Sequence, residues 1–197
     1  MCWGGAAPDP HDAATKTCAP PPGRDYTQYL KRDALAGARI GIPRAFFYDA
    51  IIAPGEMSPR GGLPADQQAM MLGAIAILKH LGATVVDPAD IPSVVVKDAA
   101  KSFLRWDTCR GYQNAKGKDA GCSIVAKYGK PGYPTVLVPF GMVANPPNPP
   151  FPPGFDPKPQ PFGVSFAGMA CSEPRLIALA YAFEQATRRR VPPPSTP

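Results

Sequence analysis

Histidine, paired cysteines and long apolar runs are scarce in this sequence. It has two histidines, and its five cysteines show no C-x-x-C spacing. We therefore expect neither a zinc site nor a disulfide framework, but reduced thiols in a cytoplasmic protein. No apolar run approaches the ~18 residues of a membrane-spanning helix, and the N-terminus does not resemble a secretory signal. The phosphate-cradling motifs G-x-x-x-x-G-K-[ST] and G-x-G-x-x-G are missing as well, so we expect no cofactor, no metal and no membrane association.

Charge of either sign is not gathered into a long block. The formal net charge is +6, and the only dense run is residues 188–190, three arginines. They follow a predicted helix, where the exposed carbonyl groups favour cations. A nucleic-acid site would need a broader basic stripe with aromatic residues, so we expect no nucleic-acid partner.

Proline, in contrast, is abundant, with 28 of 197 residues. Nine of them fall within residues 144–161, which predicts a polyproline-like surface loop joining two strands. The alternative is a ligand for a proline-recognising protein module. Residues 1–24 lack a useful period and are expected to be a loop or disordered, as is the tail 192–197.

A strand–helix–strand pattern follows the first 24 residues. A short helix is expected over 25–32, then a strand over 38–43. Apolar residues on one face predict a helix over 66–81, with Asp66 as its cap and Gly82 at its C-terminal end. A second strand over 83–87 completes a βαβ unit, so the two strands should be parallel with a right-handed crossover.

The remaining pattern completes an α/β fold, a partial mixed sheet flanked by helices within one domain over 25–191. Further strands are expected over 134–138 and 162–167, and a helix over 94–104. The clearest helix is predicted over 172–190, opened by Ser172. Its buried face is expected to comprise Leu176, Leu179, Ala180, Phe183 and Thr187.

Candidate catalytic residues are few. Ser165 lies in a sequence close to the G-x-S-x-G elbow, but the second glycine is one residue late, so we interpret it as a strand serine. His80 and His11 form no triad or metal set. Cys109, near Arg105 and Arg110, would have a lowered thiol pKa if those cations faced it, although a structural cysteine is the simpler interpretation.

Three stretches, in order, resemble the amidase-signature family. The first runs from residues 25–27 (DYT) through 35–44 (LAGARIGIPR) to 82–86 (GATVV). The second is residues 132–139 (GYPTVLVP). The third comprises residues 161–168 (PFGVSFAG), 172–174 (SEP) and 179–187 (LAYAFEQAT). Residues 8–15 are also similar to the loop that precedes the first stretch.

The resemblance implies a C–N hydrolase of linear amides that uses a Ser–Ser–Lys core and a Gly/Ser-rich oxyanion segment. In the family those residues precede the part that this sequence resembles. No Gly/Ser-rich segment occurs here, and no two of the seven serines are close in sequence: Ser58, Ser93, Ser102, Ser123, Ser165, Ser172 and Ser195. The segment between Pro92 and Tyr133 is also shorter than in the family. We therefore assign no catalytic, cofactor or metal residue.

These observations predict a truncated amidase-like pseudoenzyme. One alternative is half of a split amidase, completed by a second polypeptide. Another is an interaction module that uses the Pro-rich loop. A partial sheet would expose its edges, so we expect a partner chain or self-association to cover them.

Overall fold

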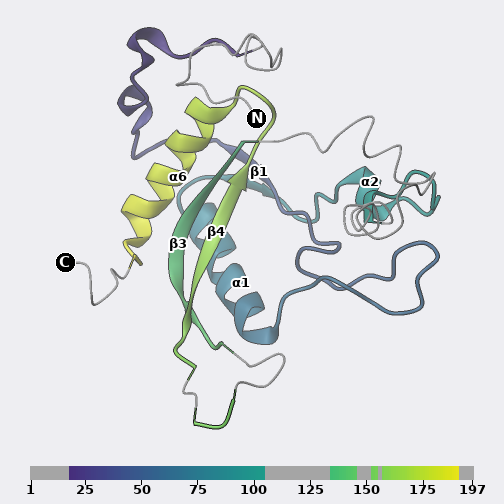
Figure 1. Ribbon diagram of the computed structural model, residues 1–197. Coiled ribbons are helices and arrows are strands. Elements are labelled where there is room, and N and C mark those ends of the chain that lie inside the picture. Colours follow the sequence, from purple (N-terminus) through teal and green to yellow (C-terminus); the bar gives the residue numbers. More distant parts are fainter. Residues whose placement is uncertain (1–17, 105–133, 146–151, 155–156, 191–197) are drawn as a thin grey trace. The chain divides into compact units, whose positions relative to one another are not determined.

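The computed structural model describes residues 18–104, 134–145, 152–154 and 157–190 (Figure 1). The chain divides into two compact units. The first unit comprises Met1–Ala38, Ala69–Ala83 and Gly132–Pro197, and the second comprises Arg39–Gln68 and Thr84–Pro131. The predicted tail and most of the predicted N-terminal loop lie outside the described residues.

The first unit is built on an antiparallel hairpin of β3 (Thr135–Val143) and β4 (Gln160–Ala167). Both strands were predicted, and both are longer than the sequence pattern indicates. Residues 144–159, only part of which the structure describes, lie between the two strands in the sequence, as predicted for the Pro-rich segment. Its last predicted residues, Gln160 and Pro161, belong to β4 instead, at the end where Val143 pairs with Gln160.

The first of these strands was predicted to end at residue 138, just before Pro139, and this boundary is wrong. Pro139 pairs with Gly163, and the next paired residue is Gly141, so Phe140 is an extra residue in the strand. A bulge tolerates proline because the ladder is already interrupted there. It also changes the spacing of buried positions along β3 from two residues (Val138, Phe140) to three (Phe140, Val143).

Helix α6 (Glu173–Thr187) covers one face of this hairpin. The Phe183 ring centroid lies 5.4 Å from that of Phe140 and 5.6 Å from that of Phe166. Leu176, Leu179, Ala180 and Phe183 are buried, as predicted from their spacing, whereas Thr187 is only partly buried. The buried members of this set belong to the apolar core of the first unit.

The predicted helix extends three residues beyond the C-terminal end of α6. Arg188 adopts a left-handed conformation with φ 48°, and its N–H donates to the carbonyl oxygen of Glu184 at 2.7 Å. The helix therefore ends at Thr187. Arg189 then places its guanidinium 4.3 Å from the centroid of the Phe140 ring, a cation–π distance.

Helix α1 (Ala65–His80) confirms the helix predicted before the second strand, with Asp66 in its first turn rather than at the cap. Its end is a Schellman motif. The N–H of Ala83 donates to the carbonyl of Leu78, and the N–H of Gly82 to that of Lys79, each at 3.0 Å. Gly82 has φ +86°, which requires glycine here, as predicted.

The second unit contains the parallel pair β1 (Arg39–Gly41) and β2 (Thr84–Val86). Both strands and their parallel pairing confirm the prediction. The single mixed sheet is not confirmed, because the described strands form two separate two-stranded sheets. The α/β class itself is correct. Each pair is formed within one unit, the parallel pair in the second and the hairpin in the first.

The second unit has its own small apolar cluster, formed by Ala53, Val94 and Leu104. Val94 lies in α2 (Pro92–Val95), which is much shorter than the helix predicted over 94–104. The carboxylate of Asp98 accepts a hydrogen bond from the N–H of Ala100 at 2.9 Å. This local turn satisfies backbone groups that a continuous helix would otherwise use, so the prediction failed.

Candidate functional site

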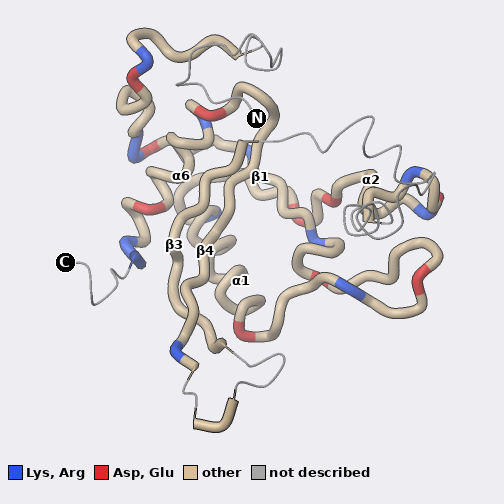
Figure 2. The backbone as a smooth tube through the Cα atoms, in the orientation of Figure 1, with Lys and Arg blue, Asp and Glu red and all other residues tan. Residues whose placement is uncertain are grey.

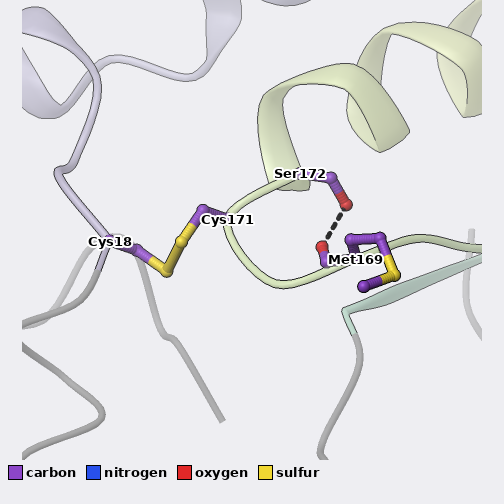
Figure 3. Close-up of a disulfide and its surroundings, with 4 residues drawn as sticks. All are labelled: Cys18, Met169, Cys171 and Ser172. Atoms are coloured by element: carbon purple, nitrogen blue, oxygen red, sulfur yellow. Dashed lines mark hydrogen bonds between the residues drawn. A yellow bond between two sulfur atoms is a disulfide. The ribbon is translucent and has the colours of Figure 1, made fainter.

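The turn between β4 and α6, residues 168–172, is held by hydrogen bonds to the neighbouring elements. The N–H of Gly168 donates to the carbonyl oxygen of Pro134 at 3.1 Å, next to the start of β3. The Ser172 hydroxyl donates to the carbonyl oxygen of Met169 at 2.6 Å (Figure 3). These bonds connect the start of β3, the end of β4 and the start of α6. We call this segment the β4–α6 turn.

Ser172 is the N-cap residue of α6, as predicted, but its hydroxyl makes no capping bond to the helix. Its backbone carbonyl accepts from the N–H of Leu176 at 2.9 Å, which starts the helical pattern. Because the hydroxyl hydrogen is directed to Met169, the Ser172 oxygen is held by the turn rather than by a base. Its observed role is structural.

A disulfide joins Cys171 in this turn to Cys18, 153 residues earlier (Figure 3). The prediction of reduced thiols is wrong for these two residues. Disulfide connectivity cannot be deduced from the spacing of cysteines, and no local motif marks either one. Cys171 has φ +67°, an uncommon conformation for a residue with a side chain.

The segment after Cys18 lies against the beginning of α6. It contains two short 3₁₀ turns, Pro22–Arg24 and Thr27–Tyr29, instead of the helix predicted over 25–32. The carboxylate of Asp25 accepts hydrogen bonds from the N–H and hydroxyl of Thr27, at 2.8 and 2.6 Å. These bonds lower the pKa of Asp25 and favour a turn over a helix.

Tyr26 faces the acidic first turn of α6. Burial raises the pKa of its phenol, and the negative charge of Glu173 raises it further. One carboxylate oxygen of Glu173 is buried and has no hydrogen-bond partner among the described residues. Tyr26 and Glu173 both belong to stretches that resemble the amidase-signature family. The structure therefore brings together two of these stretches that are far apart in sequence.

The described serines and lysines show what nucleophilic chemistry this part of the chain offers. Ser102 is the one fully buried serine among the described residues, and Ser165 lies exposed in β4 as predicted. Every described lysine is exposed: Lys31, Lys79, Lys97, Lys101 and Lys158. A lysine that serves as a general base must be neutral, and burial is the usual way to lower its pKa. None of the described lysines has that environment.

Predicted histidine and cysteine candidates do not meet in the structure. His80 lies exposed in the last turn of α1, whereas His11 and Cys109 are outside the described residues. Within the described ranges, no group of three or more histidine, cysteine or acidic residues is placed to hold a metal ion. No described helix is both long and apolar enough to cross a bilayer.

The second unit carries a separate polar network at the end of its parallel strands. Arg44 donates from Nε and Nη2 to the two carboxylate oxygens of Asp87, at 2.7 and 2.6 Å. The Arg44 guanidinium also lies 5.2 Å from the Tyr48 ring centroid. The N–H of Ala45 donates to the carboxylate of Asp90 at 2.8 Å. No sequence pattern predicted this network, although Arg44 lies within the first family-like stretch, at the end of residues 35–44.

Comparison with known proteins supports the resemblance found in the sequence. No protein-family model matches the chain. A probable amidase from Arabidopsis thaliana is 51% identical over 62 residues, which is 32% of this chain and 10% of that protein. The native peptide amidase of Stenotrophomonas maltophilia aligns with a TM-score of 0.56 and 22% identity, covering 95% of this chain and 50% of that one.

This chain is amidase-like. A second structure, the peptide amidase in complex with the competitive inhibitor chymostatin, gives a TM-score of 0.55 at 20% identity over 95% of this chain. At such identities the structural likeness establishes the fold. The amidase-like chain spans about half the length of these solved structures, and its alignment with the plant protein covers a tenth of that protein.

Proposed function

We propose that the amidase-like chain does not hydrolyse amides on its own. The observation that carries the proposal is that every described lysine is exposed, while the one fully buried serine, Ser102, has no hydrogen-bond partner among the described residues. Acyl transfer by a serine requires a base within hydrogen-bond reach of its hydroxyl. The described residues thus supply the amidase-like framework without an activated nucleophile.

The family-like stretches have structural roles that are sufficient to explain their sequences. The described part of the stretch at 132–139 supplies the first residues of β3, and the stretch at 161–168 supplies most of β4 and leads into the β4–α6 turn. The apolar residues of 179–187 fill the core beneath the hairpin. These roles support the interpretation that the family-like stretches are kept for folding and not for catalysis.

The test is a turnover assay of the purified chain on a panel of linear amides that includes peptide amides. We expect no release of ammonia or amine above that of buffer alone. Variants Ser102→Ala, Ser165→Ala and Ser172→Ala serve as comparisons. Turnover by the parent chain that one of these substitutions abolishes would contradict the proposal and identify the nucleophile.

A second candidate is that another polypeptide completes the fold and forms a split amidase with this chain. The observation that favours it is the face of the hairpin opposite α6. The register pairs Leu137 with Ser165 and Met142 with Pro161, which puts both apolar side chains on that face. Leu137 is 62% exposed and Met142 48% exposed. Neither β3 nor β4 carries a charged residue (Figure 2).

An antiparallel sheet face that meets water is normally polar, so this face is suited to a partner. The split-amidase candidate predicts that a stoichiometric polypeptide with a Gly/Ser-rich segment co-purifies from the native source. Leu137→Asp should abolish that co-purification. Met57→Asp, at a side chain 96% exposed in the second unit, should not. A lone monomer, or equal recovery with both variants, would contradict this candidate.

A further inference from the structure

We infer that Ser58 is a phosphorylation site for a proline-directed serine/threonine kinase, and that its phosphate takes the Arg60 side chain away from Glu56. The inference rests on residues 51–60, which lie between β1 and α1 in the sequence. We call this segment the 51–60 loop. The inference does not depend on whether the chain hydrolyses amides.

The sequence around Ser58 differs from that around every other serine. Ser58 is the one serine of the seven that proline follows. Proline disfavours the helical conformation for the residue before it and keeps that residue extended. An extended segment is the form in which a kinase cleft binds its substrate. Among the threonines, Thr196 alone precedes a proline, and it lies outside the described residues.

The 51–60 loop has a fixed base and an exposed tip. Ile51 and Arg60 exchange backbone hydrogen bonds at 3.1 and 3.0 Å. Ala53 is a buried member of the apolar cluster of the second unit, and Ile51 packs against that cluster. Residues 55–59 are exposed, with Met57 at 96%. A kinase therefore reaches Ser58 without unfolding the base of the loop.

Arg60 is the cation close to Ser58 in the sequence, and its guanidinium already binds an anion. Its Nε lies 3.1 Å from Oε2 of Glu56, and its Nη2 donates to the carbonyl oxygen of Leu104. The side chains of Arg60 and Glu56 are 27% and 35% exposed. Water screens an ion pair of this kind, so a stronger anion can replace the carboxylate.

A phosphoserine at position 58 is such an anion. It carries a charge of about −1.5 to −2 at pH 7 and three strong acceptor oxygens. Charge-assisted hydrogen bonds from arginine to phosphate are among the strongest in proteins. The phosphate also repels the carboxylate of Glu56, two residues before it in the chain. Phosphorylation thus exchanges the Arg60–Glu56 pair for a pair between Arg60 and the phosphate.

The modification is a phosphoryl transfer from ATP. The Oγ of Ser58 attacks the γ-phosphorus, so an oxygen–phosphorus bond forms while the bond from that phosphorus to the bridging β,γ-oxygen breaks. ADP leaves, and the hydroxyl proton passes to a base of the kinase.

Phosphorylation of the full chain by a purified mitogen-activated protein kinase with MgATP tests the site, and peptide mass spectrometry locates the phosphate. A synthetic peptide of residues 50–64 is the comparison without a fixed loop base. We expect phosphate on Ser58 in both, and none there in Ser58→Ala. Pro59→Ala should be phosphorylated about tenfold more slowly or worse, because a pocket that binds the proline ring loses apolar contacts. Thr196→Ala should behave like the parent chain at Ser58.

The site is overturned if Ser58 is phosphorylated in the peptide but not in the folded chain, or in neither. It is also overturned if Pro59→Ala leaves the rate unchanged.

Phosphorus NMR of the phosphorylated chain tests the pairing with Arg60. The second pKa of a phosphoserine is about 6, and a neighbouring cation lowers it by favouring the dianion. We expect this pKa to be lower in the parent chain than in Arg60→Gln. Glu56→Gln should lower it further, because it removes the competing carboxylate. The pairing is overturned if the parent chain and Arg60→Gln have the same phosphate pKa, or if Glu56→Gln does not lower it.

Discussion

The hydroxyl oxygen of Ser172 occupies the space that a Cβ atom on Gly168 would need. The same Cβ would lie 3.2 Å from Cδ2 of Leu176, a buried residue of α6. The end of β4 and the start of α6 therefore approach each other as closely as they do because residue 168 is glycine. The hydrogen bond to the carbonyl oxygen of Met169 holds the Ser172 hydroxyl in this position.

Gly168→Ala should destabilise the chain by about 1–3 kcal/mol, since the methyl group must displace the Ser172 hydroxyl and press on Leu176. Urea unfolding followed by circular dichroism measures this loss. In the background Ser172→Ala, the same substitution should cost less, because the displaced oxygen is no longer there. An equal cost in both backgrounds would show that the two residues do not interact.

Gly73→Ala is the matched glycine substitution and should have the opposite sign. Gly73 lies within α1, is exposed, and has no atom within 4 Å of the Cβ position. Alanine loses less backbone entropy than glycine in a helix, so stability should rise by about 0.5–1 kcal/mol. A lower urea midpoint for this variant would contradict the described course of α1.

Arg44→Lys should destabilise the chain by about 1–2 kcal/mol, because lysine cannot donate two parallel hydrogen bonds to Asp87. The side chains of Arg44 and Asp87 are 27% and 21% exposed, so water replaces these bonds only in part. Lys101→Met, which removes the exposed ion pair with Asp98, is the control and should change stability by less than about 1 kcal/mol. Equal effects in thermal unfolding would contradict a special role for Arg44.

Ser102→Ala should leave stability unchanged or raise it. Ser102 is completely buried, with 0% of its surface exposed to solvent. Its hydroxyl has no hydrogen-bond partner within the described ranges. A buried hydroxyl without a partner costs roughly 1–3 kcal/mol, and alanine removes that cost while keeping most of the side-chain volume. Destabilisation beyond about 1 kcal/mol in a urea titration would reveal a partner for this hydroxyl.

Periodicity in the sequence was enough to predict the helices that bury one face. Leu176, Leu179, Ala180 and Phe183 are spaced for one side of α6, and all four are buried. Gly82 was equally predictable, because a helix that ends in a left-handed residue favours glycine there. In both cases the signal lies within a few residues along the chain.

Other features depend on contacts between distant residues, which single-sequence patterns do not contain. β3 continues past Pro139 because Phe140 forms a bulge between the Pro139–Gly163 and Gly141–Phe162 pairs. The disulfide of Cys18 and Cys171 spans most of the chain, and neither cysteine lies in a recognisable motif. The Arg44–Asp87 pair joins residues 43 positions apart. Each of these three features can be recognised only in the folded structure, where residues distant in sequence come into contact.

The candidate site was predictable in part. The family-like stretches indicated which segments matter, and the structure places the one containing Tyr26 against the one containing Glu173. The sequence did not indicate that the Ser172 hydroxyl would be directed to Met169, since that bond depends on the path of the β4–α6 turn.

Labelling with a fluorophosphonate probe would reveal any catalytic serine in this chain, because such probes react with serines whose hydroxyl is activated by a base. The purified chain is incubated with the probe, and modified residues are located by peptide mass spectrometry. We expect no serine of the folded chain to be labelled faster than in the urea-unfolded chain. Rapid labelling of one serine in the folded chain, lost on unfolding, would contradict it.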